Sequence, residues 1–274
     1  MGMFDPLLPD LGRPRAADPM EQFEIVEIFP LAFNDQISLG FTNASLWMAI
    51  TVLTALGFFT LSTKRVALVP GRMQSMGEVA YEFVANMVRD TMGDEGRQFF
   101  PFVFTLFIFI FLSNLLGLLP TIPTAPHALH VFTPTSHIIV TFTLALMSVG
   151  LVVIYGVMKN GFKFLKLFAP AGVPVWLLPL ITPIEIISFL SRPVSLSVRL
   201  FANMLAGHVV LKVFAGFVGG LLATGGVLTV FSIFPLIGVV GVFLLEFLVA
   251  FLQAFVFAIL TCIYLKDALD PAHH

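Results

Sequence analysis

Long apolar runs separated by short polar stretches make up the chain from Phe41 onward. Three of these runs, residues 46–61 with their flanks, 99–119 and 138–158, have the length of about 20 residues that a helix needs to cross a bilayer. Residues 72–98 differ, because apolar side chains recur there every three or four positions and charged side chains take the opposite side. That pattern predicts an amphipathic helix lying at the membrane surface or packed on it.

The last third of the chain holds two longer apolar segments. Residues 227–265 carry Glu246 as their only charge, and a straight helix of that length would measure about 58 Å, roughly twice the hydrocarbon thickness. Such a helix must tilt strongly, bend at Pro235 or begin as a re-entrant segment. Glycine pairs bracket the preceding turn, so residues 174–266 are predicted to form a long, strongly tilted hairpin.

Composition agrees with a polytopic membrane protein of the all-α class. The 274 residues are 58% hydrophobic and 11% charged, whereas a soluble domain has about 25% charged residues. The net charge of -2 offers no basic surplus for nucleic acid. We expect five membrane-crossing helices and one surface helix within a membrane domain at residues 40–274. Residues 1–39 are acidic and lack the apolar core of a signal peptide, so they are predicted to be a retained polar arm.

The positions of Lys and Arg predict the orientation. Residues 62–98 carry five of them and residues 159–166 carry three, whereas residues 120–137 and 216–226 carry none. Because basic residues concentrate on the cytoplasmic side, the N-terminus should lie outside and the C-terminus inside.

Residues 184–207 carry charges that an ordinary buried helix would not need. Helical periodicity places Glu185, Arg192, Arg199 and Asn203 on one face, among serines and alanines. A charged side chain at the bilayer centre costs about 3 kcal/mol on insertion scales, so such a residue is a candidate for function. Small neighbours let another helix approach closely. The pattern therefore predicts a face that presents Arg199 to a partner helix.

The second arm of the hairpin offers polar partners to the first. Glu246 and Gln253 share one face of that arm, and His208 lies on the side of the first arm opposite to Arg199. We expect His208 to reach across the hairpin while Arg199 faces outward, provided that Pro193 does not shift the helical phase.

Structural explanations compete for several polar residues. Glu185 and Arg192, seven residues apart, are spaced for an ion pair that merely lets the helix insert. Asn114 is expected to form a hydrogen bond between helices, and Cys262 to be a small buried hydrophobe.

Three histidines in one linker raise the question of a metal site. His127, His130 and His137 have spacings that a helix would turn to one side, but the linker has three prolines and no carboxylate. A plain exposed loop is the favoured interpretation, and we expect neither a metal nor a cofactor.

Four motifs carry a resemblance to a known family. The stretches PVSLSVRLFANM at residues 193–204, AGH at 206–208, LQAFVF at 252–257 and FLSNLLGLLP at 111–120 are similar to subunit a of the F-type ATP synthases, in order and in spacing. The resemblance implies a proton-translocating stator subunit that is not catalytic alone. It further implies two half-channels beside a rotating ring of c subunits, contacts with peripheral-stalk b-type subunits and with lipid, and the inner membrane of a bacterium, with the mitochondrial inner membrane less expected. The hairpin at residues 174–266 would then carry the proton path.

The resemblance assigns roles to individual residues. Arg199 matches the essential arginine between the two half-channels, and its guanidinium stays charged and cannot pass a proton itself. Asn203 and Gln253 match polar residues that flank it. Glu185 matches an acidic position on the cytoplasmic side.

His208 and Glu246 depart from the pattern of some bacterial relatives, which carry Glu at the first position and His at the second. A paired exchange suggests that the two side chains touch, and it resembles the mitochondrial arrangement. The pair would belong to the path for protons from the outside, since His208 lies past Arg199 in that direction. Sodium in place of protons is one alternative, and a secondary transporter is another, although its internal inverted repeat is not visible.

Overall fold

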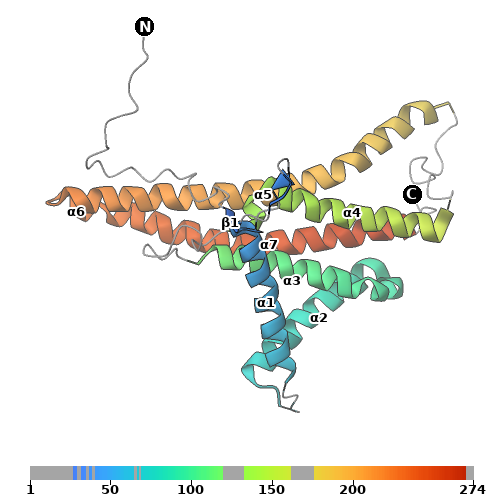
Figure 1. The fold of residues 1–274 in the computed structure, drawn as a ribbon, viewed down its shortest axis with the longest axis horizontal. Coiled ribbons are helices and arrows are strands. Elements are labelled where there is room, and N and C mark those ends of the chain that lie inside the picture. Colours follow the sequence, from blue (N-terminus) through green and yellow to red (C-terminus); the bar gives the residue numbers. More distant parts are fainter. Residues whose placement is uncertain are drawn as a thin grey trace, which may run out of the picture.

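The computed structural model describes residues 27–29, 32–34, 37–38, 41–64, 67, 69–119, 133–161 and 176–269. Within these ranges five helices are long and apolar enough to cross a membrane, namely α1 Asn43–Thr63, α3 Phe100–Gly117, α4 Ile138–Asn160, α5 Leu178–Thr224 and α7 Ile233–Leu269. The prediction of an all-α membrane protein with five crossing helices is confirmed. Figure 1 shows α4, α5 and α7 running roughly along the longest axis, with α1 steeply inclined to them.

Four short strands precede α1. β1 Glu27–Phe29 pairs antiparallel with β4 Phe41–Thr42, and β2 Ala32–Asn34 pairs antiparallel with β3 Ile37–Ser38. The sequence pattern predicts only a polar arm over most of this segment. Strands of two or three residues leave no periodic signal, because only their pairing defines them.

The amphipathic segment forms α2 Arg72–Met92, followed by the 3₁₀ helix η2 Gly93–Gln98. Its expected apolar face is buried in the second half of the helix, at Val84, Met87 and Val88. The first half turns a different side inward, because Met73 and Met76 are exposed whereas Gln74 and Gly77 are buried.

The reason lies in the contact of α2 with α1. The Ser62 hydroxyl donates a hydrogen bond of 3.0 Å to the Met73 carbonyl. A β-carbon at Gly77 would collide with the Ser62 hydroxyl, so the small residue permits the close approach. Local packing thus selects the buried face where hydrophobicity alone predicted another.

The predicted hairpin consists of α5 and α7, with the short helix α6 Leu228–Phe231 in its turn. Gly225 and Gly226 have φ angles of 68° and 66°, a backbone conformation that glycine adopts without strain. Pro235 lies in the first turn of α7, where a missing N–H costs nothing, so it does not bend the helix interior. Pro183 and Pro193, by contrast, lie inside α5.

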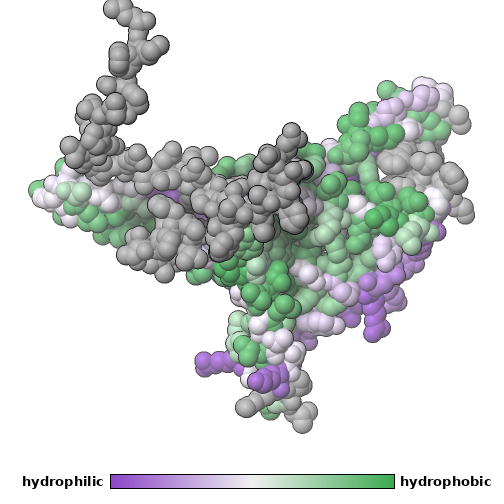
Figure 2. Space-filling model, viewed as in Figure 1, coloured by the Kyte–Doolittle hydropathy of each residue, from purple (hydrophilic) through white to green (hydrophobic). Residues whose placement is uncertain are grey.

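Prolines inside a helix remove backbone hydrogen bonds and cause bends. Figure 1 accordingly shows the first part of α5 diverging from α7, while the remainder runs beside it. The second part of α5 buries the stripe Leu196, Leu200 and Met204 in the main core, together with Phe257 and Ala258 of α7. Figure 2 shows apolar residues over much of the visible face, with hydrophilic residues gathered around α2 and η2.

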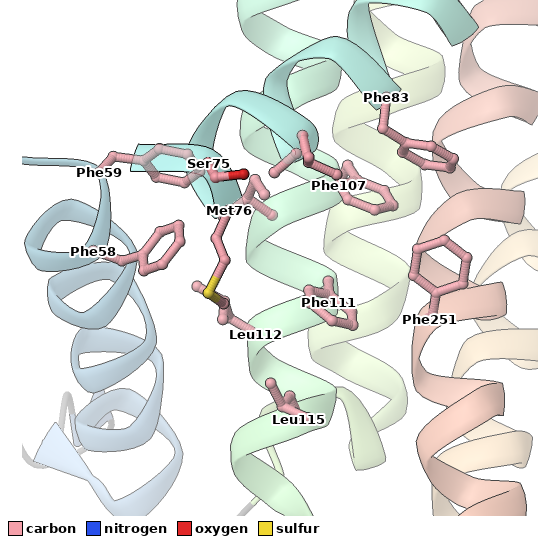
Figure 3. A pocket seen from close by; sticks show the side chains of 13 residues that line it. Phe58, Phe59, Ser75, Met76, Phe83, Phe107, Phe111, Leu112, Leu115 and Phe251 are labelled. Atoms are coloured by element: carbon pink, nitrogen blue, oxygen red, sulfur yellow. The ribbon is translucent and has the colours of Figure 1, made fainter. Parts of the chain in front are cut away.

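An apolar pocket of about 640 Å³ lies among α1, α2, α3 and α7. Figure 3 shows Phe58 and Met76 on one side of it, with Phe111 and Phe251 on the other. None of the residues that line this pocket is titratable, so it is not a candidate for moving protons.

Candidate functional site

Arg199 lies on the exposed side of α5, in the part of the helix that runs beside α7. Ala202 and Ala206, one and two turns later, are exposed on the same side. Within the described ranges Arg199 forms no ion pair, whereas His208 on the same helix is buried. The expected separation of the two residues onto different sides of α5 is therefore observed, and Pro193 does not disturb it.

Asn203 and Gln253 meet across the hairpin. The Asn203 Nδ2 donates a hydrogen bond of 2.9 Å to the Gln253 Oε1. Asn203 is exposed beside Arg199, and Gln253 is buried on α7. The pair links the exposed face that carries Arg199 to the interior of the hairpin.

His208 and Glu246 also meet across the hairpin, in a drier setting. The His208 Nδ1 lies 3.3 Å from the Glu246 Oε1, close enough for an ion pair when the ring is protonated and just beyond ordinary hydrogen-bond range. The exposed fractions are 9% for His208 and 3% for Glu246. Neither carboxylate oxygen of Glu246 accepts a hydrogen bond from the described residues. Because a buried carboxylate without a hydrogen bond is costly, a hydrogen-bond donor placed beside it would stabilise it strongly. The contact that the paired exchange of residue types suggested is present.

Gly207 makes room for this carboxylate. A β-carbon built on Gly207 would lie 2.6 Å from the Glu246 Oε1 and 2.9 Å from its carboxyl carbon, distances that force a displacement. In the sequence, Gly207 is notable only as part of the AGH motif at residues 206–208. The hydrophobic pattern of the surrounding residues does not indicate that the other arm of the hairpin packs on this glycine.

Gly207→Ala is expected to push the Glu246 side chain away from His208 and to reduce proton flux, although alanine normally stabilises a helix by about 1 kcal/mol relative to glycine. Gly219→Ala is the matched control, because it lies on the same helix and a β-carbon there meets nothing within 4 Å. ATP-driven proton uptake in membrane vesicles measures both variants. Equal activity in the two would show that the contact at Gly207 is unimportant.

Two threonines from the connection before α4 bond to helices of the core, one of them to His208. The Thr133 Oγ1 lies 2.9 Å from the His208 Nε2, immediately before the 3₁₀ helix η4 Pro134–Ser136. The Thr135 hydroxyl donates to the Asn114 Oδ1 at 2.6 Å, and the Asn114 Nδ2 donates to the Ala250 carbonyl at 3.4 Å. Asn114 therefore bonds between helices α3 and α7, as predicted. Sequence reasoning missed the two threonines, because a short linker has no periodicity that indicates their partners.

Arg192 forms a different ion pair from the one that the sequence suggested. Its Nη1 lies 3.5 Å from the Asp267 Oδ2, and its guanidinium lies 4.5 Å from the centre of the Tyr264 ring. The proposed structural pairing with Glu185 is therefore wrong. The physical reason is that α7 runs past Arg192 and offers both a carboxylate and an aromatic face. Glu185 is half-buried near the start of α5.

The described residues contain no group of three His, Cys, Asp or Glu side chains that would hold a metal ion. Of the three linker histidines only His137 is described, and His127 and His130 lie outside the described residues. Cys262 is buried in the core, as predicted.

Comparison with known proteins adds to this geometry. Residues 45–266 match the family described as ATP synthase A chain. The chain is 58% identical over 258 residues to ATP synthase subunit a of Maricaulis maris, an alignment that covers 93% of this chain and 98% of the relative. It is 56% identical over 256 residues to ATP synthase subunit a of Mesorhizobium japonicum, with the same coverage of 93% and 98%. Taken with five membrane-crossing helices and a hairpin carrying an exposed arginine, these matches show that the chain belongs to the ATP synthase A chain family.

Proposed function

We propose that this chain is the proton-translocating stator subunit of a bacterial ATP synthase, with Arg199 at the boundary between two half-channels. The observation that carries the proposal is the position of Arg199, an exposed cation without an ion-pair partner in the described structure, on a face of α5 that small residues keep open. A partner that brings a carboxylate to this face would complete the pair. A guanidinium stays charged at any relevant pH, so it attracts that carboxylate without passing the proton.

The small residues of the same face suit a close helical partner. Ala202 and Ala206 are exposed next to Arg199, and small side chains let two helices pack closely within a membrane. A ring of c subunits, each with a membrane-embedded carboxylate, fits these requirements. The subunit would not be catalytic alone, and b-type subunits of the peripheral stalk would hold it against the rotating ring.

The polar residues of α5 are spread along its length. Glu185 precedes Arg199 by 14 residues, about 21 Å of helix, and His208 follows it by nine residues, about 14 Å. Two proton paths that open at opposite ends of this helix and do not connect directly would use such an arrangement. Glu185 would serve the cytoplasmic path, and His208 with Glu246 the outer one, while Asn203 and Gln253 lie between them. In this proposal residues 40–274 form the membrane domain, residues 1–39 are its polar N-terminal arm, and the hairpin at residues 174–266 holds both paths.

The test of this function is ATP-driven ion uptake by inverted membrane vesicles that contain the assembled complex. Proton translocation predicts acidification of the vesicle interior that does not require sodium and that a protonophore collapses. Sodium-dependent uptake that persists with the protonophore would contradict the proposal and favour a sodium-translocating subunit. Ion transport by this chain alone in liposomes would instead favour a secondary transporter.

Labelling of single cysteines tests the proposed orientation. Lys159→Cys at the end of α4 should react with a membrane-impermeant thiol reagent only from the cytoplasmic side, and Val227→Cys in the hairpin turn only from the outside. Both positions are exposed, and the native Cys262 is buried, which keeps background labelling low. Reaction of both cysteines from the same side would refute the orientation.

A further inference from the structure

The hydrogen bond between Thr133 and His208 joins a linker to the middle of α5. The Thr133 Oγ1 lies 2.9 Å from the His208 Nε2, and the exposed fraction of Thr133 is 5%. The other ring nitrogen, Nδ1, is the one that faces Glu246 at 3.3 Å. Both nitrogens of the imidazole therefore have a defined neighbour, one from the linker and one from α7.

The chemistry of these neighbours determines which nitrogen of a neutral ring carries the hydrogen. An ionised carboxylate only accepts hydrogen bonds, so the nitrogen facing Glu246 is the favoured place for the N–H. The other nitrogen then holds a lone pair and needs a donor. A threonine hydroxyl can rotate to donate, and Thr133 lies at the required distance.

We propose that Thr133 is a positioning residue of the outer half-channel: its hydroxyl donates to the His208 Nε2 and thereby keeps the hydrogen of the neutral ring on Nδ1, the nitrogen nearer to Glu246. The inference rests on the proposed proton path. It assigns Thr133 no contact with the ring of c subunits and no exchange of protons of its own.

The surroundings of Thr133 hold its side chain in place. Both the Ser136 N–H, at 2.9 Å, and the Ser136 hydroxyl, at 2.6 Å, donate to the Thr133 carbonyl. The Thr133 side chain lies against Gly117 of α3, where an added β-carbon would collide with its hydroxyl and methyl groups. Pro134 further restricts the backbone of the residue before it to extended conformations. Such a fixed hydroxyl is suited to orienting the imidazole ring of His208.

Among the described residues, two helices bring charged groups near His208. Glu246 faces it from α7, and Lys212 lies one turn further along α5, near enough to act on it electrostatically. On α3 the uncharged Asn114 bonds to Thr135 and to the Ala250 carbonyl. Thr133 can therefore select between the two nitrogens by donating a hydrogen bond to one of them.

The experiment compares Thr133→Val with Thr135→Val in the assembled complex. Both changes remove one buried threonine hydroxyl from the same segment while keeping the side-chain shape, but the Thr135 hydroxyl bonds to Asn114 and not to His208. The measurement is ATP-driven proton uptake over a range of pH. Thr133→Val should lower the flux about five- to tenfold, the effect of one lost hydrogen bond.

The pH of half-maximal flux should also move upward in Thr133→Val, by about half a unit, because the neutral ring loses the donor that stabilises it. Thr133→Ser, which keeps the hydroxyl, should restore both flux and pH profile. Thr135→Val should leave the pH profile where it is in the unchanged protein.

Several outcomes would overturn the inference. An unshifted profile in Thr133→Val, or the same shift in Thr135→Val, would mean that the Thr133 hydroxyl is merely structural. If Thr133→Val fails to assemble, Gly117→Ala displaces the Thr133 hydroxyl without removing it and should produce the same upward shift, whereas an unshifted profile in that variant refutes the inference. Unimpaired flux in His208→Phe would instead overturn the proposed proton path itself, so the two failures are distinguishable.

Discussion

Replacing Arg199 with alanine is expected to abolish proton-driven ATP synthesis while the complex still assembles. The side chain is exposed on α5 and forms no ion pair in the described structure, so its removal leaves no buried partner unpaired and the fold intact. A passing carboxylate, however, loses the cation that stabilises it while it is unprotonated. Removing such a preorganised charge typically costs about 100- to 1,000-fold in rate, which would take synthesis to background.

Two further variants sharpen this experiment. Arg199→Lys should rescue poorly, because an ammonium is more strongly hydrated and gives up its proton more readily when desolvated. Ser195→Ala is the control, since Ser195 is exposed one turn earlier and, within the described part of the chain, its hydroxyl bonds to the carbonyl of Ser191 in its own helix. Its synthesis should be normal. Passive proton leak should rise in the alanine variant, and near-normal synthesis there would remove Arg199 from the proposed mechanism.

His208 and Glu246 are expected to act as one unit, so that replacing either by an apolar residue slows proton flux about 100-fold. General acid–base groups contribute on this scale. Each change also leaves the other polar group buried without its neighbour, since the two lie 3.3 Å apart and both are buried. Proton exchange within such a close pair belongs to the pair, and it cannot be divided between the two residues.

The exchange variant tests the coupling directly. Combining His208→Glu with Glu246→His restores one acid and one imidazole with their positions swapped. Residues in contact couple by about 1–3 kcal/mol, so the double variant should exceed the poorer single change by about tenfold or more in proton flux. Gly207→Ala in the same background should reduce this recovery, because the side chain at position 246 packs on that glycine. A double variant no better than the poorer single change would show that the two residues act separately.

The sequence was sufficient for the helices and for much of the candidate site. Apolar runs must cross the bilayer as helices, since no water is available there for backbone groups, and five such runs became α1, α3, α4, α5 and α7. The helical period of 3.6 residues predicts Arg199 and His208 on different sides of α5, and in the structure Arg199 is exposed whereas His208 is buried. The family was recognisable because its motifs lie on these same helices.

Other contacts between elements distant in sequence were decided only by the tertiary structure. Arg192 was matched to Glu185 by spacing within one helix, yet it pairs with Asp267, which α7 brings from the far end of the chain. The same holds for Thr133 and His208, which lie 75 residues apart and meet because the neighbouring helix η4 contacts both α3 and α5. Periodicity describes which side of one helix a residue faces. The partner on that side depends on how the helices cross. Small residues such as Gly77 and Gly207 determine the crossing, because they let a side chain of the neighbouring helix approach closely.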